Sequence, residues 1–194
     1  MILYFSPGAC SLADHIALIE AGLSFSGAKV DLKTHRTEDG RDYLGVNPKG
    51  YVPALQFDDG QILTENIAIL SWAADRAPSL APGGELGRYR LLEALAYLSS
   101  EVHKAFAPFF DPSAGEAQKA QAEARLGQRL GFLAGRLKGD YLFDAFSVAD
   151  AYLFVMLTWA GQRRLSLADP LPAYAARIRA RPAVRQALAE EGLT

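Results

Sequence analysis

Apolar positions divide the chain into a first part with strand and helix patterns and a second part with helix patterns alone. Residues 2–5 form a short apolar run that predicts a strand. Leu12, Ile16 and Ile19 then recur at the spacing of one helix face. Residues 26–32 predict a second strand.

The following residues predict a hairpin and then a helix. Strands are expected at residues 52–57 and 61–64, on either side of the turn signal Asp59-Gly60. Helical spacing resumes at about Asn66, which is expected to cap a helix that ends before Pro78. Residues 34–42 form a polar, loop-like stretch between the second and third strands. The order of elements expected for the first 77 residues is βαβαββα, which places a helix in the same interval.

A linker separates the two parts. Residues 78–87 hold two prolines and three glycines, which is typical of a connecting segment. We therefore predict an α/β domain at residues 1–77 and an all-α domain at residues 88–194.

The second domain is predicted to contain only helices. Its two apolar stripes are Leu91, Leu95, Leu98, Val102 and Phe106, and Leu126, Leu130, Leu133 and Leu137. Ser147 and Asp150 have the spacing of a capping box, which predicts the start of a third helix. Shorter helices are expected at residues 171–181 and 183–190.

Composition and charge exclude several classes of protein. Half of the 194 residues are apolar and 22% are charged, which is typical of a folded chain rather than a disordered one. The formal net charge of −2 argues against nucleic acid as a partner. No apolar run reaches the roughly 18 residues of a membrane span, and residues 1–5 lack the features of a signal peptide. We expect a cytoplasmic protein without a membrane partner.

Cys10 is the one cysteine of the chain, and this excludes a domain held by disulfides and a metal site made of several thiolates. A free cysteine is more often a small buried apolar residue than a nucleophile. Here it lies at a predicted strand–turn–helix junction, where the helix N-terminus favours a thiolate and a pKa below about 8.5. Because the chain has no second cysteine, a disulfide would require a small external thiol.

Six segments together resemble the bacterial beta-class glutathione S-transferases. They are YFSPGACSL (residues 4–12), NPKGYVPAL (47–55), LTEN (63–66), SEVHK (100–104), SVADAYLF (147–154) and EEGL (190–193). These segments occur in order and extend over nearly the whole chain.

The resemblance implies a thioredoxin-like N-terminal domain that binds glutathione as co-substrate, with no permanently bound cofactor and no metal. The helical domain would contribute an electrophile pocket and the contacts of a homodimer. The implied activity is conjugation of glutathione to small, mostly apolar electrophiles in detoxification. Two alternatives stay open: a glutathione-dependent thiol–disulfide reductase that uses Cys10, and a non-catalytic binder of glutathione or apolar ligands.

The resemblance also implies site residues. Catalytic roles fall to Cys10, His103 and Ser11, and the glutathione contacts to Cys10, His35, Tyr51, Val52, Pro53, Glu65, Asn66, Glu101, His103 and Lys104. Pro53 would be the cis-proline of the fold, which frees the Val52 backbone for glutathione. Glu65 would pair with the γ-glutamyl ammonium, and Glu101 would reach glutathione across the dimer. The electrophile pocket would be lined by Phe106, Phe109, Phe110 and Trp159, although each of these is as well explained by core packing.

Three positions depart from the family pattern. His35 stands where a lysine is common, Ala96 where an asparagine is common, and Phe5 where many relatives have a second tyrosine. Tyr4 and Ser11 remain candidate hydroxyl donors behind Cys10. The sequence leaves open whether Cys10 forms a mixed disulfide with glutathione or only hydrogen-bonds it.

Overall fold

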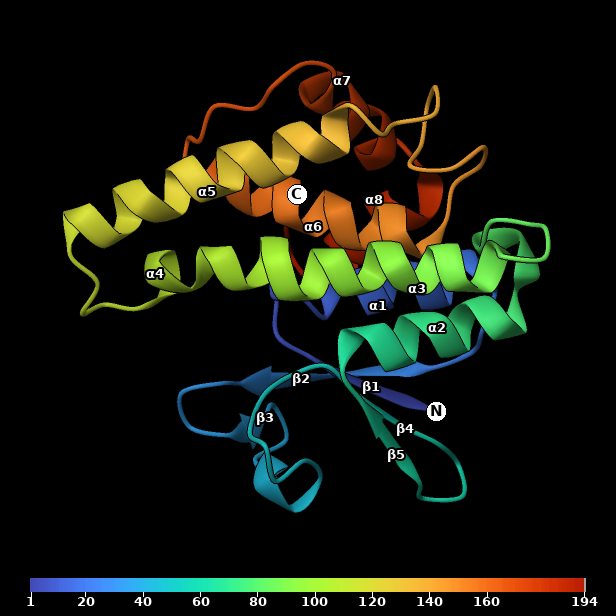
Figure 1. Cartoon of the computed structure of the whole chain (residues 1–194). Helices are drawn as coiled ribbons and strands as arrows, with labels where there is room; N and C mark the ends of the chain where they lie inside the picture. The colour runs from blue at the N-terminus through green and yellow to red at the C-terminus, as the bar shows by residue number, and fades with distance from the viewer. Residues whose placement is uncertain (194) are drawn as a thin grey trace.

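The computed structural model describes residues 1–193 and contains one five-stranded mixed sheet beneath several layers of helices (Figure 1). The strands are β1 (Ile2–Phe5), β2 (Ser26–Asp31), β3 (Arg36–Thr37), β4 (Ala54–Gln56) and β5 (Ile62–Thr64). Their spatial order is β3-β2-β1-β4-β5. The central strand β1 pairs in parallel with β2 and antiparallel with β4. The fold is the expected thioredoxin-like α/β domain joined to an all-helical domain.

Two helices lie between the sheet and the helical domain, α1 (Leu12–Glu20) and α2 (Asn66–Arg76) (Figure 1). The prediction of a helix between the second and third strands is wrong. That segment forms the short strand β3 and a 3-10 turn, η1 (Tyr43–Gly45), in which the Asp42 side chain accepts from the Leu44 N–H. Local side-chain bonds of this kind compete with helix formation.

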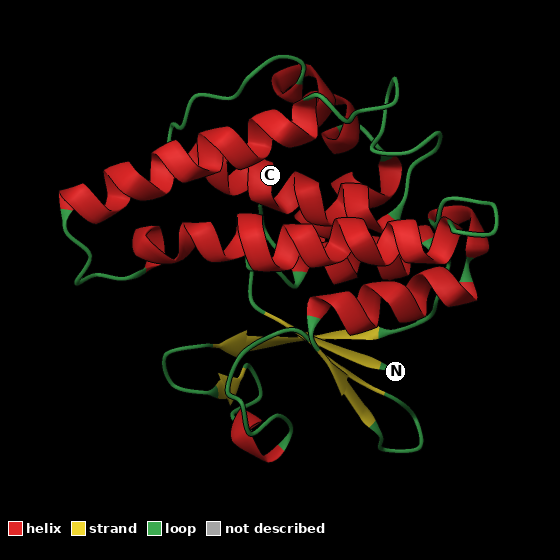
Figure 2. Ribbon diagram, in the orientation of Figure 1, coloured by secondary structure: helices red, strands yellow, loops and turns green. Residues whose placement is uncertain are grey.

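The second part is helical, as predicted (Figure 2). Its helices are α3 (Gly87–Tyr97), α4 (Ala107–Phe110), α5 (Glu116–Ala134), α6 (Val148–Gln162), α7 (Leu171–Arg179) and α8 (Pro182–Glu190). Between α3 and α4 the chain passes through a π-helical segment, η3 (Leu98–Val102), and a 3-10 segment, η4 (His103–Phe106). The expected linker holds one 3-10 turn, η2 (Pro78–Leu80). The capping box of α6 is confirmed, since Asp150 Oδ2 accepts from the Ser147 N–H at 2.8 Å.

The apolar core is continuous from the sheet into the helical domain. Leu3 and Phe5 belong to the large cluster that includes both predicted leucine stripes except Leu137, which is partly buried against it. Tyr4 faces the other side of the sheet, where it packs with Tyr43. Helix α1 is packed against α6 and α8. The residues next to Cys10 are therefore held by both domains.

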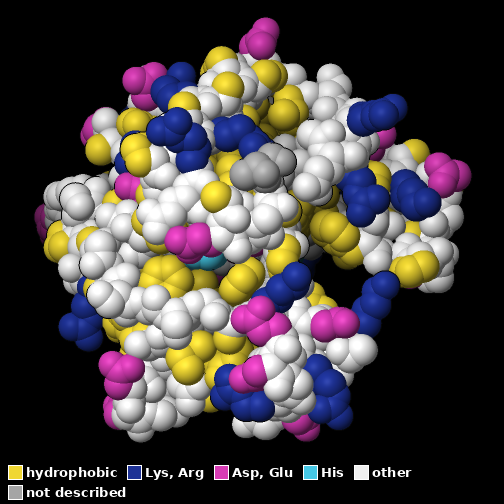
Figure 3. Space-filling model, turned by 180° about the vertical axis from the view of Figure 1, so that it is seen from behind, with side chains coloured by type: hydrophobic (Ala, Val, Ile, Leu, Met, Phe, Trp, Pro, Cys, Tyr) yellow, Lys and Arg dark blue, Asp and Glu magenta, His cyan; other side chains and the backbone are white. Residues whose placement is uncertain are grey.

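The surface fits the charge balance of the sequence. On the face shown in Figure 3, acidic side chains are interspersed with lysines and arginines. Within residues 1–193, no helix combines the length and the apolar character that a membrane crossing needs.

Candidate active site

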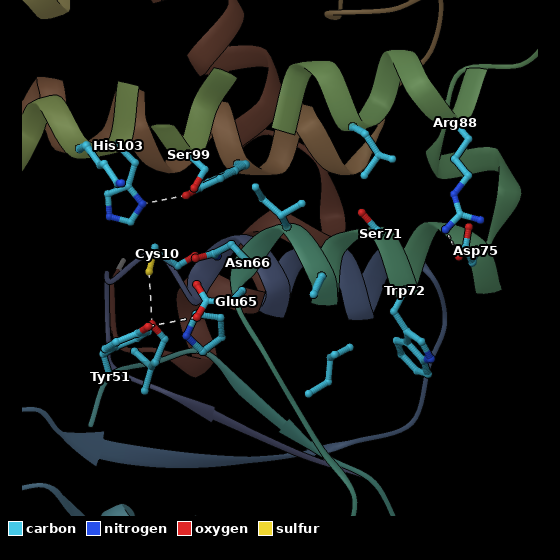
Figure 4. Close-up of a pocket in the computed structure, with 18 residues that line it drawn as sticks. Cys10, Tyr51, Glu65, Asn66, Ser71, Trp72, Asp75, Arg88, Ser99 and His103 are labelled. Carbon is cyan, nitrogen blue, oxygen red and sulfur yellow. Dashed lines mark hydrogen bonds and ion pairs between the residues drawn. The ribbon is translucent and has the colours of Figure 1, made fainter. Parts of the chain in front are cut away.

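A cleft of about 870 Å³ lies between α2 and the helical segments α3, η3 and η4 (Figure 4). Cys10 lies at one end of this cleft. The structure brings to it many of the residues expected from the sequence, namely Cys10, Tyr51, Val52, Pro53, Glu65, Asn66, His103 and Lys104. The cleft continues along α2 and α3 to an end that the sequence did not indicate, lined by Ser71, Trp72, Asp75, Arg88 and Leu92.

Cys10 follows β1 and precedes α1, and its Sγ lies 3.5 Å from the Val52 carbonyl oxygen. The Val52–Pro53 peptide bond is cis, as the resemblance implied. Burial, and after it the charge of Asp14, raises the pKa of the Cys10 thiol to about 12. Backbone N–H groups at the helix start lower this pKa, but by less than burial raises it. The prediction that Cys10 is a thiolate is therefore wrong for the unliganded site, where its neutral S–H group donates to the Val52 carbonyl.

Asp14 is a buried carboxyl beneath the cleft that the sequence analysis missed. The Asn66 side-chain amide joins it to the cysteine, because Nδ2 donates to Asp14 Oδ2 at 2.7 Å and to the Cys10 carbonyl at 2.9 Å. Burial raises the pKa of Asp14 well above its usual value. The expected capping role of Asn66 is wrong, since Glu65 holds the cap position of α2 and Asn66 is its first residue. The signal for Asp14 was an acidic residue in the first turn of the helix that follows Cys10.

Glu65 is held at the mouth of the cleft in an unusual backbone conformation, with φ at 75°. Its Oε1 accepts from the Tyr51 hydroxyl at 3.0 Å and pairs with the Lys49 ammonium. The hydrogen bond from Lys49 holds the pKa of Glu65 below its usual value. Glu65 therefore offers a carboxylate to a ligand. Lys49 was not predicted as a site residue, although it lies in the same loop as Tyr51.

The loop that carries Tyr51 is fixed by polar contacts on its inner side. The Tyr51 carbonyl accepts from Asn47 Nδ2 at 2.7 Å and from the Tyr43 hydroxyl at 2.9 Å. Gly50 has φ at 75°, and a Cβ there would lie 2.9 Å from the His35 ring. His35 Nδ1 lies 3.0 Å from the Gly50 carbonyl oxygen. His35 therefore supports this loop and is not among the residues that line the cleft.

His103 lies across the cleft from Cys10 (Figure 4). It directly follows the π-helical segment, a feature that often marks functional positions. Its Nδ1 is 2.7 Å from the Tyr152 hydroxyl, a partner that the sequence analysis did not single out. Burial lowers the pKa of His103 to about 4, so the ring is neutral at neutral pH. Lys104, beside it, is exposed and adds positive charge at the cleft.

Several expected residues lie away from the cleft. Ser11 is fully buried, and its Oγ accepts from the Ser6 N–H at 3.2 Å. Tyr4 is fully buried and donates its hydroxyl to Gln56 at 2.9 Å. Glu101 is paired with Arg129 Nε at 2.9 Å. In the single chain, Ser11 and Tyr4 therefore support the fold around the site, and Glu101 is held on the surface of η3.

The aromatic residues expected to form the electrophile pocket are not lining residues of this cleft. Phe106 is fully buried, and the Trp159 ring contacts Phe106, Phe110 and His103. Phe106 and Trp159 are therefore core residues, as the alternative explanation by core packing expected, whereas Phe110 is half exposed. Within this cluster of Phe106, Phe109, Phe110 and Trp159, the Trp159 ring packs edge-on against the His103 ring.

Two of the departures from the family pattern also lie outside the cleft lining. Phe5 is buried against the His15 ring, and Ala96 is exposed on α3. Among residues 1–193, no group of three or more His, Cys, Asp or Glu side chains is arranged to hold a metal ion.

Comparisons with known proteins agree with this geometry. Residues 9–76 match the glutathione S-transferase N-terminal domain, and residues 97–182 match the C-terminal domain. The chain is 44% identical to glutathione S-transferase GstA of Escherichia coli O157:H7, over the full length of both proteins.

Solved structures give the same result over the full length of both chains. A sphingomonad glutathione S-transferase complexed with glutathione is 51% identical, with a TM-score of 0.93. The beta-class glutathione S-transferase of Sphingomonas chungbukensis is 48% identical, with a TM-score of 0.91. The chain is therefore an enzyme of the bacterial glutathione S-transferase family, with beta-class members among its structural neighbours and glutathione as its co-substrate.

Proposed function

We propose that the enzyme conjugates glutathione to small, mostly apolar electrophiles at the Cys10 end of the cleft. The observation that carries this proposal is the convergence of Cys10, Glu65 and His103 on one cleft from three separate segments. A carboxylate, a neutral thiol and a neutral imidazole there match the ammonium and thiol ends of glutathione.

The γ-glutamyl end of glutathione is proposed to bind at the start of α2. Its ammonium would pair with Glu65 and replace contacts that Lys49 and Tyr51 now make. The N-terminus of α2 would attract the carboxylate of the same group. The Val52 backbone would hydrogen-bond the cysteinyl part of the ligand and so align its sulfur with Cys10.

The glutathione sulfur is proposed to react as a thiolate that Cys10 stabilises without itself reacting. A neutral S–H group can donate a hydrogen bond to a thiolate, and the ammonium of Lys104 favours the negative charge. If the Tyr152 hydroxyl donates to His103 Nδ1, the ring proton is on Nε2 and supplies a second donor. Attack on an electrophilic carbon then forms the new carbon–sulfur bond and expels the leaving group.

The raised pKa of Cys10 disfavours the alternative of a thiol–disulfide reductase. Disulfide exchange needs a thiolate, and a thiol with a pKa of about 12 forms very little of it at neutral pH. A reductase that uses Cys10 would therefore need a bound ligand to lower this pKa.

Turnover of 1-chloro-2,4-dinitrobenzene with glutathione tests the proposed conjugation. We expect saturable formation of the thioether and release of chloride, followed by absorbance and by mass spectrometry of the product. S-methylglutathione is the matched control, because it lacks a free thiol and should inhibit without being consumed. Binding of glutathione without any turnover would instead support the non-catalytic binder.

A homodimer is part of the proposal. Leu86 and Tyr89 are 56% and 66% exposed beside the Arg88 end of the cleft, where a second copy could cover them. The cytoplasmic location and the role in detoxification that the resemblance implies also belong to this proposal.

A further inference from the structure

A buried contact joins the C-terminal end of the chain to the loop that carries Cys10. Glu191 follows α8, and its side chain is fully buried although it carries an acidic group. Its Oε2 accepts from the Gly8 N–H at 2.8 Å. Gly8 lies only two residues before Cys10, whereas Glu191 lies 183 positions further along the chain.

The other side of the same carboxylate is held by His15. Glu191 Oε1 lies 3.0 Å from His15 Nδ1, and Glu190 Oε2 lies 2.7 Å from His15 Nε2. A neutral imidazole has one N–H, so both contacts are hydrogen bonds only when the ring is protonated. Burial lowers the pKa of His15, but its hydrogen bonds to the two glutamates raise it above the usual value overall. His15 thus fixes the Glu191 carboxylate by a charge-assisted bond.

The backbone carbonyl of Gly8 is also held by the helical domain. The Trp159 indole donates Nε1–H to the Gly8 carbonyl at 2.7 Å. Gly8 has φ at 71°, and a Cβ there would lie 3.7 Å from the Leu193 side chain. Both backbone polar groups of Gly8, its N–H and its carbonyl, are thereby fixed by the helical domain, in a turn conformation that favours glycine.

We propose that Glu191, itself oriented by His15, is a positioning residue that holds the Gly8–Cys10 loop so that the Cys10 thiol is placed for the reaction. Glu191 is not among the residues that line the cleft, so it acts through the backbone N–H of Gly8. Loss of this contact would leave the Gly8 N–H without its buried acceptor and let the loop shift. Small displacements of reacting groups can lower turnover strongly. The catalytic part of this inference rests on the proposed function.

Variants at Glu191 and its neighbour Glu190 test the proposal. Glu190→Ala is the matched control, because Glu190 contacts His15 but not Gly8, and it is half exposed. In Glu191→Ala we expect Cys10 to be alkylated by iodoacetamide about fivefold faster, because the loop opens more often. We also expect kcat with saturating glutathione to fall about tenfold, with a smaller change in KM. Glu190→Ala should stay within about twofold of the parent enzyme in both measurements.

Conservative variants separate positioning from general stability. Glu191→Gln keeps an oxygen that can accept from the Gly8 N–H. Its Cys10 alkylation rate and its kcat should therefore lie close to those of the parent enzyme. If Glu191→Ala cannot be purified in folded form, Glu191→Asp gives the same comparison, because its shorter side chain draws the carboxylate back from Gly8. Equal alkylation rates and kcat in the Glu191 and Glu190 variants would overturn the proposal, as would a glutamine variant no better than alanine. The alkylation measurement needs no glutathione, so it decides the loop's role even if the parent enzyme shows no conjugation.

Discussion

Replacing Glu65 with alanine is expected to raise the KM for glutathione by about tenfold to a hundredfold, with a much smaller change in kcat. Glu65 is an ionised carboxylate at the start of α2, and its pKa is held down by Lys49. Without it, the ligand ammonium loses a charged partner and Lys49 stays unpaired at the cleft. Initial rates over a range of glutathione concentrations measure the effect.

Glu116→Ala is a suitable control for this experiment. Glu116 is an exposed acidic residue that pairs with Lys119 and does not line the cleft. We expect its KM for glutathione to stay within about threefold of the parent value. A Glu65 variant with an unchanged KM would contradict the proposed position of the γ-glutamyl end.

Replacing Cys10 distinguishes a hydrogen-bond donor from a nucleophile. Cys10→Ala removes the donor to the glutathione thiolate, and we expect kcat to fall by about tenfold to a hundredfold. Cys10→Ser keeps an O–H donor at nearly the same place and should retain activity within about fivefold of the parent. The measurement is kcat for conjugation at saturating glutathione.

The comparison of these two variants decides the role of Cys10. If both variants lose all conjugation equally, a covalent role for the sulfur replaces the donor role. Intact mass spectrometry without reductant adds a second criterion, since a glutathione adduct on Cys10 would show that the mixed disulfide forms.

The fold was largely predictable because its elements depend on local patterns. The apolar run at residues 2–5 predicted a strand, and the structure confirms it as β1. The capping box at Ser147 was equally local. The prediction of a helix before the third expected strand was wrong. The side chains of Asp42 and Asn47 accept hydrogen bonds from backbone N–H groups of their own loop, and apolar periodicity does not reveal such bonds.

The site was less predictable because its chemistry depends on contacts between distant segments. The helix start predicted a thiolate at Cys10, but burial and Asp14 outweigh it. The resemblance implied that Phe106 lines an electrophile pocket. Its place on the apolar stripe with Val102 agrees better with the structure, in which Phe106 is fully buried and His103 lines the cleft.

The pH dependence of Cys10 alkylation distinguishes a neutral thiol from a thiolate in the unliganded enzyme. Cys10 is the one cysteine of the chain, so iodoacetamide modification reports on this thiol alone. With a pKa of about 12, the unliganded enzyme should react slowly at pH 7, and its rate should rise about tenfold per pH unit without a plateau up to about pH 10. A rate that levels off with a midpoint below about pH 8 would show a thiolate at neutral pH. That result would contradict Cys10 as a neutral donor.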